Sequence, residues 1–380
     1  MSAVTVSAIR LASAVNAARA IVAARADIPV MQCVLLTAAH GELTVAATDL
    51  SQGVSYCIPC EGAGQWLIKF DRLQSFVSAC NKKADVTISG AGTANLKCGS
   101  VSARIPCLDA KDFPDLLSRP TFDGDAHFEA ARFVGLLARI GSVCDRKGRI
   151  FETGVAITAR NGQCRMQATT AVISGWSTIP APPHIDVESY IAAENCVVIA
   201  SLFDGVPVWA SGDRNTFWVK SSECTYYCKC IDGESADVSS VTPNASQVAT
   251  VDVAAMSAAT KAARSFADGR SSAVYLSVGG IGSFVGATDG MSCLCVPYDC
   301  EGGQFSFTMN GEKLNALLSA CGAETAGMGI SDGSGGVKIP HIQIVAGDFM
   351  GLICGMTERP SETSAIINAY LGDTPQQVAA

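Results

Sequence analysis

The chain of 380 residues contains few charged side chains, 16% of the total, and few aromatic ones, 7%. Apolar residues make up 48%, so we expect a packed globular protein with little disorder. The sequence contains no run of about eighteen apolar residues, so a membrane-spanning helix is not expected. The formal net charge of −8 argues against a basic protein overall, but it does not locate the 27 Lys and Arg.

The usual signs of catalysis or metal binding are also missing. The four histidines, His40, His127, His184 and His341, lie at unrelated places, and none accompanies a Cys or Ser in a nucleophile motif. Seventeen cysteines are present, but they lack the two paired knuckles of a zinc ribbon. We therefore expect no enzyme activity, no cofactor and no metal, and we expect reduced thiols in the cytoplasm.

The first 25 residues are rich in Ala and Arg and lack acids, as some transit peptides do. Leu11, Val15, Ala18 and Val22 form one helical stripe in this segment. We therefore interpret the segment as the first helix of a domain.

A sixteen-residue pattern occurs three times without gaps, at residues 34–49, 155–170 and 274–289. Each copy alternates, contains Gly in a central turn and ends in Ala-Thr followed by Asp or Thr, which predicts a β-hairpin. The offsets are 155 − 34 = 121 and 274 − 155 = 119 residues. This spacing matches a whole domain rather than a solenoid unit of about 20 to 50 residues. We interpret the chain as three tandem copies of one domain.

Each copy also predicts two helices. The first helix precedes the hairpin, at about 8–24, 129–143 and 253–267. The second follows it in copies one and three, where the apolar stripes are Leu73, Phe76, Val77 and Cys80, and Leu314, Leu317, Leu318 and Cys321. The fold class is therefore α+β, with helices covering one face of an antiparallel sheet in each copy.

Turn-rich segments at 108–125 and 231–246 separate the copies. They predict domains at 1–121, 122–247 and 248–358. Residues 359–380 lie outside the repeat, and we expect them to form a loosely attached C-terminal tail.

Two acids recur at equivalent positions of the hairpin pattern, Asp49 and Asp289. They suggest an acid pair at first sight. We favour a role in a turn at the end of a strand, because a repeated scaffold repeats its structural residues.

Basic residues gather on or beside the predicted helices. They are Arg10, Arg19, Arg25, Arg72, Lys82, Lys83, Arg132, Arg139, Arg146, Lys147, Arg149, Lys261 and Arg264. Arg132, Arg139 and Arg146 are spaced by seven residues, so they share one face, away from the apolar stripe. A single basic residue on a helix is usually solvated surface. Together, in an acidic protein, they predict a positive surface that binds a phosphate backbone without reading sequence.

Several segments of the sequence resemble a known family, the bacterial DNA polymerase III β subunit or sliding clamp. The resemblance rests on residues 28–54 (IPVMQCVLLTAAHGELTVAATDLSQGV), 108–117 (LDAKDFPDLL), 149–155 (RIFETGV) and 309–314 (MNGEKL). It covers roughly residues 1–358.

The resemblance implies three clamp domains per chain and a head-to-tail homodimer that closes a ring around duplex DNA. Helices would line the hole and present the basic residues above to the DNA. The protein would be a processivity factor whose partners are double-stranded DNA, a polymerase and a clamp loader. No membrane partner is implied.

The family binds its protein partners through a short peptide docked between domains two and three. The resemblance places that groove at Thr169, Thr170, Val172, Ile173, Pro243, Lys313, Met350, Leu352, Ile353 and Met356. The usual Thr-Asp-Gly-His-Arg-Leu wall reads Thr-Thr-Ala-Val-Ile-Ser here, and Lys313 replaces a Tyr. We expect an apolar groove that has lost its charged and hydrogen-bonding groups, so its peptide specificity is open.

The leading hypothesis is a divergent sliding clamp serving a restricted set of partners. Two alternatives stay open. One is a ring-forming regulatory or interaction paralogue that does not serve replication. The other is a cysteine-based redox or metal protein on the same scaffold.

Overall fold

The computed structural model describes residues 3–22, 28–114, 127–235, 238, 245, 247–269, 271–331, 340–356 and 360–373. The chain forms two compact units, each described by itself below. Unit 1 comprises residues 1–134, 182–191 and 197–230, and unit 2 comprises 135–181, 192–196 and 231–380. The middle copy of the repeat is thus shared between the units, and the predicted domain boundaries remain predictions.

Unit 1 is built on one mostly antiparallel sheet whose strands follow the order β6–β7–β8–β5–β2–β3–β4–β15–β14–β13, with β1 pairing both β6 and β5. Its elements in the first copy are β1 Ala3–Ser7, α1 Ala8–Arg19, β2 Cys33–Ala39, β3 Glu42–Thr48, β4 Gln52–Pro59, β5 Glu61–Lys69, α2 Phe70–Ala79, β6 Asp85–Ser89, β7 Thr93–Cys98 and β8 Val101–Leu108. Those from the second copy are β13 Trp209–Gly212, β14 Thr216–Lys220 and β15 Cys224–Lys229.

Unit 2 contains two antiparallel sheets, ordered β9–β10–β11–β24–β23–β22–β16–β20 and β19–β18–β17–β21. Its elements are β9 Gly154–Arg160, β10 Gln163–Thr169, β11 Ile173–Pro180, β16 Gln247–Asp252, α5 Val253–Arg264, β17 Ala273–Val278, β18 Phe284–Thr288, β19 Cys293–Pro297, β20 Cys300–Glu301, β21 Phe305–Asn310, α6 Gly311–Cys321, β22 Thr325–Ser331, β23 His341–Ala346, β24 Phe349–Cys354 and α7 Pro360–Asp373. Three further elements are divided between the units: α3 Ala130–Gly141, β12 Val187–Ala192 and α4 Ala193–Phe203.

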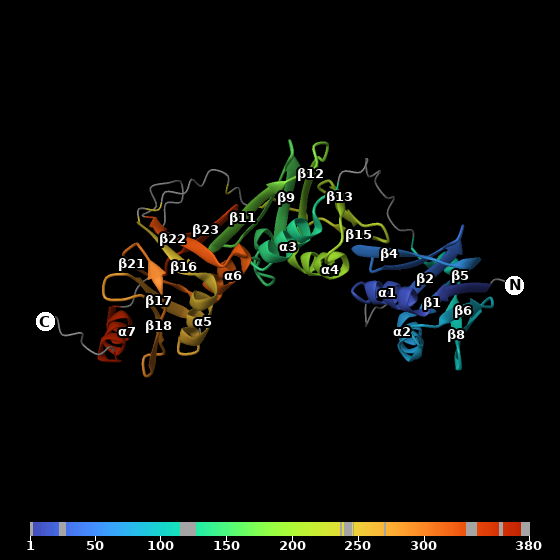
Figure 1. Ribbon diagram of the computed structural model, residues 1–380, viewed down its shortest axis with the longest axis horizontal. Helices are drawn as coiled ribbons and strands as arrows, with labels where there is room; N and C mark the ends of the chain where they lie inside the picture. The colour runs from blue at the N-terminus through green and yellow to red at the C-terminus, as the bar shows by residue number, and fades with distance from the viewer. Residues whose placement is uncertain are drawn as a thin grey trace. The chain divides into compact units, whose positions relative to one another are not determined.

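The three predicted hairpins are present as β2–β3, β9–β10 and β17–β18. They form because apolar side chains alternate with polar ones, so that one face of each hairpin enters a core. Leu36, Val45 and Val34 are buried in the first hairpin, for example. The helix pairs also form as predicted, with α1 against α2 in unit 1 and α5 against α6 in unit 2 (Figure 1).

The helices follow from their apolar stripes. In α1, Leu11 and Val15 are buried, whereas Arg10 and Arg19 are exposed. In α6, Asn310 caps the N-terminus by accepting hydrogen bonds from the N–H groups of Glu312 and Lys313, both at 3.0 Å. The helix ends at Gly322, whose φ of 62° lies in the left-handed region that favours glycine. Among the described residues, every helix is too short or too polar to span a bilayer.

The prediction of a loose C-terminal tail is wrong for residues 360–373. They form α7, and Ile366 is only 5% exposed because it packs against Tyr275 and Phe284 of the third hairpin. Figure 1 shows α7 in red on the side of β17 and β18 away from α5. Residues 360–373 are therefore part of the packing around the third hairpin.

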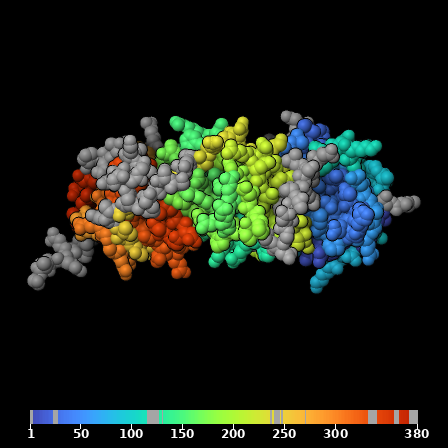
Figure 2. All heavy atoms as spheres, turned by 90° about the horizontal axis from the view of Figure 1, so that it is seen from above, coloured from blue at the N-terminus to red at the C-terminus, as the bar shows by residue number. Residues whose placement is uncertain are grey.

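Two joints connect successive copies of the repeat through paired strands. In unit 1, β4 pairs with β15, with Gln52 opposite Cys228 and Tyr56 opposite Cys224. In unit 2, β11 pairs with β24, with Ile173 opposite Ile353 and Ser177 opposite Phe349. Figure 2 shows the green spheres of the second copy meeting the red ones of the third without a gap. Each joint thus extends a sheet from one copy into the next.

Candidate nucleic-acid interface and partner groove

The basic residues predicted to bind DNA lie on or just beyond helices, and most reach solvent. Arg25 lies outside the described residues. The exposed ones are Arg10, Arg19, Arg72, Lys82, Lys83, Arg132, Arg146, Lys147, Arg149, Lys261 and Arg264. Exposed cations on helices can approach a phosphate backbone without first losing a buried partner.

Two of these exposed cations already have acidic partners. The Arg10 guanidinium lies 3.4 Å from the Glu223 carboxylate, which also accepts a 2.7 Å hydrogen bond from the Tyr56 hydroxyl. Arg132 pairs with Glu129 one turn away, at 3.2 Å. Because these side chains are about half exposed, the pairs are weak and leave both guanidinium groups open to exchange for phosphate.

Arg139 is placed differently from its neighbours in the sequence. It is half-buried, and its guanidinium donates to the main-chain oxygen of Gly322 at 3.4 Å. That oxygen is at the C-terminal end of α6, where the helix dipole is negative. Arg139 therefore holds α6 against α3, a role that its seven-residue spacing did not reveal.

The turn after each hairpin is closed in the same way three times. The Asp49 carboxylate accepts hydrogen bonds from the N–H groups of Ser51 and Gln52, at 2.9 and 2.8 Å. The Asp289 carboxylate accepts from Met291 and Ser292, at 2.8 and 2.6 Å, and these bonds lower its pKa. The prediction of a turn role for both acids is confirmed, and their equivalence needs no acid pair.

In the second copy, the hydroxyl of Thr170 takes over this role. It accepts from the N–H groups of Val172 and Ile173, at 3.2 and 3.0 Å. Thr169 and Thr170 are both 7% exposed and Ile173 is 1% exposed. This loop is therefore well packed, and only the half-buried Val172 among the four predicted groove residues is appreciably accessible.

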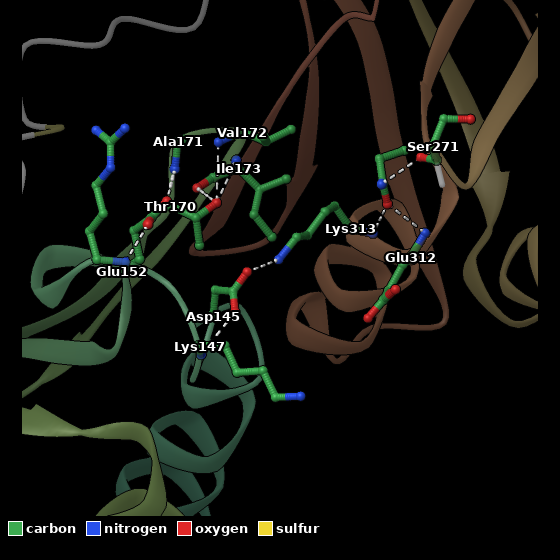
Figure 3. Close-up of polar contacts among 12 residues, drawn as sticks. Asp145, Lys147, Glu152, Thr170, Ala171, Val172, Ile173, Ser271, Glu312 and Lys313 are labelled. Atoms are coloured by element: carbon green, nitrogen blue, oxygen red, sulfur yellow. Dashed lines mark hydrogen bonds and ion pairs between the residues drawn. The ribbon is translucent and has the colours of Figure 1, made fainter. Parts of the chain in front are cut away.

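Glu152, which the sequence analysis did not single out, fixes the Thr170 loop from below (Figure 3). It is 8% exposed, and its carboxylate accepts from the N–H groups of Ala171 at 2.6 Å and Arg149 at 2.7 Å. With the offsets of the repeat, the equivalent residues are Met31 and Ser271. The second copy thus has an acid at position 152 and an uncharged Thr in its turn. The other two copies have an acid in the turn, Asp49 or Asp289, and an uncharged residue at the position equivalent to Glu152.

Lys313, the predicted third wall of the groove, is bound to the second copy. Its ammonium lies 3.0 Å from the carboxylate of Asp145 (Figure 3). The hydrogen bond from Lys313 and another from the Lys147 N–H hold the Asp145 pKa below its ordinary range. The Lys313 side chain is 23% exposed. The residue that replaces the family's Tyr thus joins the first turn of α6 to the loop after α3.

The predicted C-terminal wall is split between two faces of its ladder. Side chains alternate along β24, so Met350 and Leu352 point to one face and Ile353 points to the other. Ile353 is fully buried, Leu352 is 5% exposed and Met350 is half-buried. Met356 follows the strand, is half-buried and donates its N–H to the Thr308 oxygen at 2.8 Å. Pro243 lies outside the described residues.

The cysteines among the described residues are free thiols. Burial raises the pKa values of Cys144 and Cys164 to about 12, so these thiols are protonated at neutral pH. No group of three or more His, Cys, Asp or Glu in the described part of the chain is arranged to hold a metal ion.

Residues 2–117 match the family model for the N-terminal domain of the DNA polymerase III beta subunit. No curated protein matches the chain by sequence.

Solved structures match over almost the whole chain. The DnaN sliding clamp of Pseudomonas aeruginosa bound to griselimycin has a TM-score of 0.84 at 16% identity, covering 94% of this chain and 100% of that one. The DNA polymerase III beta subunit of Thermotoga maritima has a TM-score of 0.81 at 15% identity, with the same coverage. The beta sliding clamp of C. crescentus has a TM-score of 0.82 at 17% identity, covering 94% and 99%. The chain thus has the three-domain fold of bacterial sliding clamps, and its first domain matches the DNA polymerase III beta subunit family by sequence.

Proposed function

We propose that this protein is a DNA sliding clamp, a non-enzymatic processivity factor. Two copies would close head to tail into a ring around duplex DNA, and the ring would hold a polymerase on its template. The observation that carries the proposal is the repeated joint, because it predicts how the remaining two strand edges of the chain are used.

At both internal joints, the strand that follows a hairpin pairs with the last strand of the next copy. The remaining strand that follows a hairpin is β19, at the edge of its four-stranded sheet. The remaining last strand is β8, which pairs with β7 and, at Cys107 and Leu108, with β5. Among the described residues, no strand pairs with the other edge of β8 at 101–105. Exposed edges of this kind favour pairing with another chain, so β19 of one copy would pair with β8 of a second.

The internal joints also predict the register of this third joint. Cys224 and Phe349 each come first in their last strand, as Val101 does in β8. Counting from these positions places Ser102 of the second copy opposite Cys295, and Arg104 of the second copy opposite Cys293. Directly opposed residues of an antiparallel pair are about 4.5 to 5.5 Å apart at Cα, a separation that a disulfide spans.

One hydrogen bond of the internal joints cannot form at the third. Lys229 donates its N–H to the oxygen of Ser51 at 2.8 Å, and Cys354 donates to Val172 at 2.9 Å. The equivalent donor in β8 is residue 106, which is proline and has no N–H. Proline is tolerated at a strand edge for this reason.

The ring is tested by oxidative cross-linking of Ser102→Cys to the native Cys295. We expect a covalent dimer, whereas Ala103→Cys should not link to Cys295 because its side chain points to the opposite face. Cys295→Ser in the Ser102→Cys background is the control for the sixteen other thiols. A protein that sediments as a monomer at all concentrations, or equal linking by both variants, would contradict the proposal.

DNA binding is tested through its dependence on salt. Lys261→Glu with Arg264→Glu removes two exposed cations of α5. If both contact phosphates, the slope of log K against log salt should become less steep by about 1.8, from about 0.9 for each contact. The matched control, Lys97→Glu with Lys229→Glu, changes the same charge on strands and should leave the slope unchanged.

The partner groove is tested with a peptide of the Gln-Leu-x-Leu-Phe type that the family resemblance implies. A dissociation constant in the micromolar range would support binding through Val172, Met350 and Met356, the predicted groove residues that are half-buried rather than buried. Substituting Val172→Asp should weaken that binding. The absence of binding at millimolar peptide would mean that the tether recognises other sequences.

A further inference from the structure

The helix α7 packs on one face of the third hairpin, at a seat formed by Gly282, Phe284 and Gly286. Tyr370 stacks on Phe284 with their ring centroids 4.0 Å apart. A side-chain carbon at Gly286 would overlap Ile366, and one at Gly282 would overlap the Tyr370 hydroxyl. Residues 282, 284 and 286 alternate along one face, so two glycines and a large ring together fit the shape of the helix.

The equivalent faces of the other hairpins lack the aromatic ring and the glycine. The positions that match Phe284 and Gly286 are Thr44 and Ala46 in the first copy, and Arg165 and Gln167 in the second. In the third copy this face carries the Phe284 ring and α7 covers it, whereas in the first copy Ala46 packs in a cluster with Val30, Met31 and Phe113.

The same helix runs beside the free edge of the sheet. The Cys295 thiol donates to the main-chain oxygen of Ile366 at 3.1 Å, and Cys293 and Cys295 both pack against the cluster of Tyr275, Phe284 and Ile366. Successive contacts from Gly286 at Ile366 to Gly282 at Tyr370 show that α7 runs antiparallel to β18, and therefore in the direction of β19. The helix accompanies the edge strand along its length.

We infer that α7 is a docking surface for a second copy of this chain, with β8 of that copy as its occupant. The inference rests on the proposed ring, which places Ser102 and Arg104 of the second copy opposite Cys295 and Cys293. Those two cysteines point to the face that α7 covers. The exposed side chains on β8 at Ser102 and Arg104 therefore emerge beside the helix.

A comparison with the internal joint in unit 1 shows what the helix supplies. There the incoming strand brings Tyr227, which lies over Gly53 and hydrogen-bonds to the Thr48 hydroxyl at 3.1 Å. The position equivalent to Tyr227 on β8 is Arg104, which brings no ring. At the third joint, α7 covers this face from the receiving side, and Ala365 and Asn368 are exposed positions on the helix.

The test places a photo-reactive benzoylphenylalanine at Ala365 or at Asn368 in the full chain. Irradiation should link α7 to residues 101–108 of a second copy, identified by mass spectrometry of a mixture of isotopically light and heavy protein. The matched control is the same group at Thr158, an exposed position on β9, which should give no such link. A second measurement is the dimer dissociation constant of Ala365→Arg, which we expect to rise at least about tenfold.

The outcomes separate this inference from the proposed function. If Ser102→Cys links to Cys295 but the probes on α7 reach no second copy and Ala365→Arg dimerises normally, the ring stands and the role of α7 is overturned. If the wild-type chain does not dimerise at all, both fall. Hydrogen exchange of β17 and β18 in Ala365→Arg must match the wild type, which shows that α7 stays packed on the hairpin. If α7 detaches in the variant and the dimer still forms normally, the inference is also overturned.

Discussion

The first and third hairpins have equivalent strands but differ in the side chains on one face. Both bury one face against their own helices, through residues such as Val45 in β3 and Val285 in β18. They differ on the other face, where the first hairpin carries Thr44 and the third carries Phe284 beneath a helix. The comparison shows that the inner faces pack alike, whereas the outer faces are covered by different segments, around Val30 and Phe113 in the first copy and by α7 in the third.

Removing the ring of Phe284 should break this difference and have the largest effect. Phe284→Ala deletes a side chain that is fully buried between α7 and the sheet. We expect a loss of about 3 to 5 kcal/mol in the free energy of unfolding of the third domain, measured by chemical denaturation. Hydrogen exchange should show α7 opening first.

The equivalent change in the first hairpin provides the control for Phe284→Ala. Thr44→Ala removes a small, half-buried side chain that carries no ring beneath a helix such as α7, so we expect a change within about 0.5 kcal/mol. Equal losses in the two variants would mean that α7 does not depend on its seat.

The second hairpin differs from both through Glu152. Glu152→Gln leaves one of two backbone N–H groups, from Ala171 or Arg149, facing an amide NH₂. We expect a cost of about 1 to 3 kcal/mol, with faster hydrogen exchange at residues 170–173. Glu188→Gln, at an exposed carboxylate paired with Arg214, should change stability by less than about 1 kcal/mol.

Making the second turn more like the others should destabilise it. Thr170→Asp restores the acid found at Asp49 and Asp289 but places it beside the Glu152 carboxylate. Repulsion between like charges should cost about 1 kcal/mol at pH 7. In a double-mutant cycle, Glu152→Gln should recover most of that cost, and strictly additive losses would refute the coupling.

The smallest effect should come from the ion pair between Lys313 and Asp145. The pKa of Asp145 is lowered in the folded state. The ion pair therefore contributes fully to the free energy of unfolding above the unfolded pKa of about 3.9, and this contribution is lost as pH falls through the folded pKa. Lys313→Met should cost at most about 1 kcal/mol near neutral pH, because both side chains are partly exposed. The difference from wild type should shrink in acid, and a loss that is constant with pH would point to packing instead.

Patterns within short segments of the sequence were enough to predict the hairpins, the helices and the turns. Alternation predicted the hairpins, and apolar stripes predicted the paired helices. The role of Asp49 and Asp289 was also predictable, because a turn is closed by residues two and three positions away.

The parts that the sequence did not reveal depend on contacts between distant segments. Glu152 meets Ala171, and Asp145 meets Lys313, only because the fold brings their segments together. The seat of α7 was missed because Gly282 and Gly286 resemble ordinary turn and strand residues until Ile366 and Tyr370 are placed over them. The resemblance to clamps correctly indicated the fold, but it did not show that Ile353 points away from Met350 and Leu352.

Pro106 has a mechanical consequence for an assembled ring. Each internal joint contains a hydrogen bond from the N–H of Lys229 or Cys354, and the proposed joint between copies would lack its equivalent. Under a load applied equally around the circumference, the seam between copies would rupture first, and the seams within a chain would stay shut. A ring of this kind would therefore open at the joint between copies, because Pro106 supplies no N–H there.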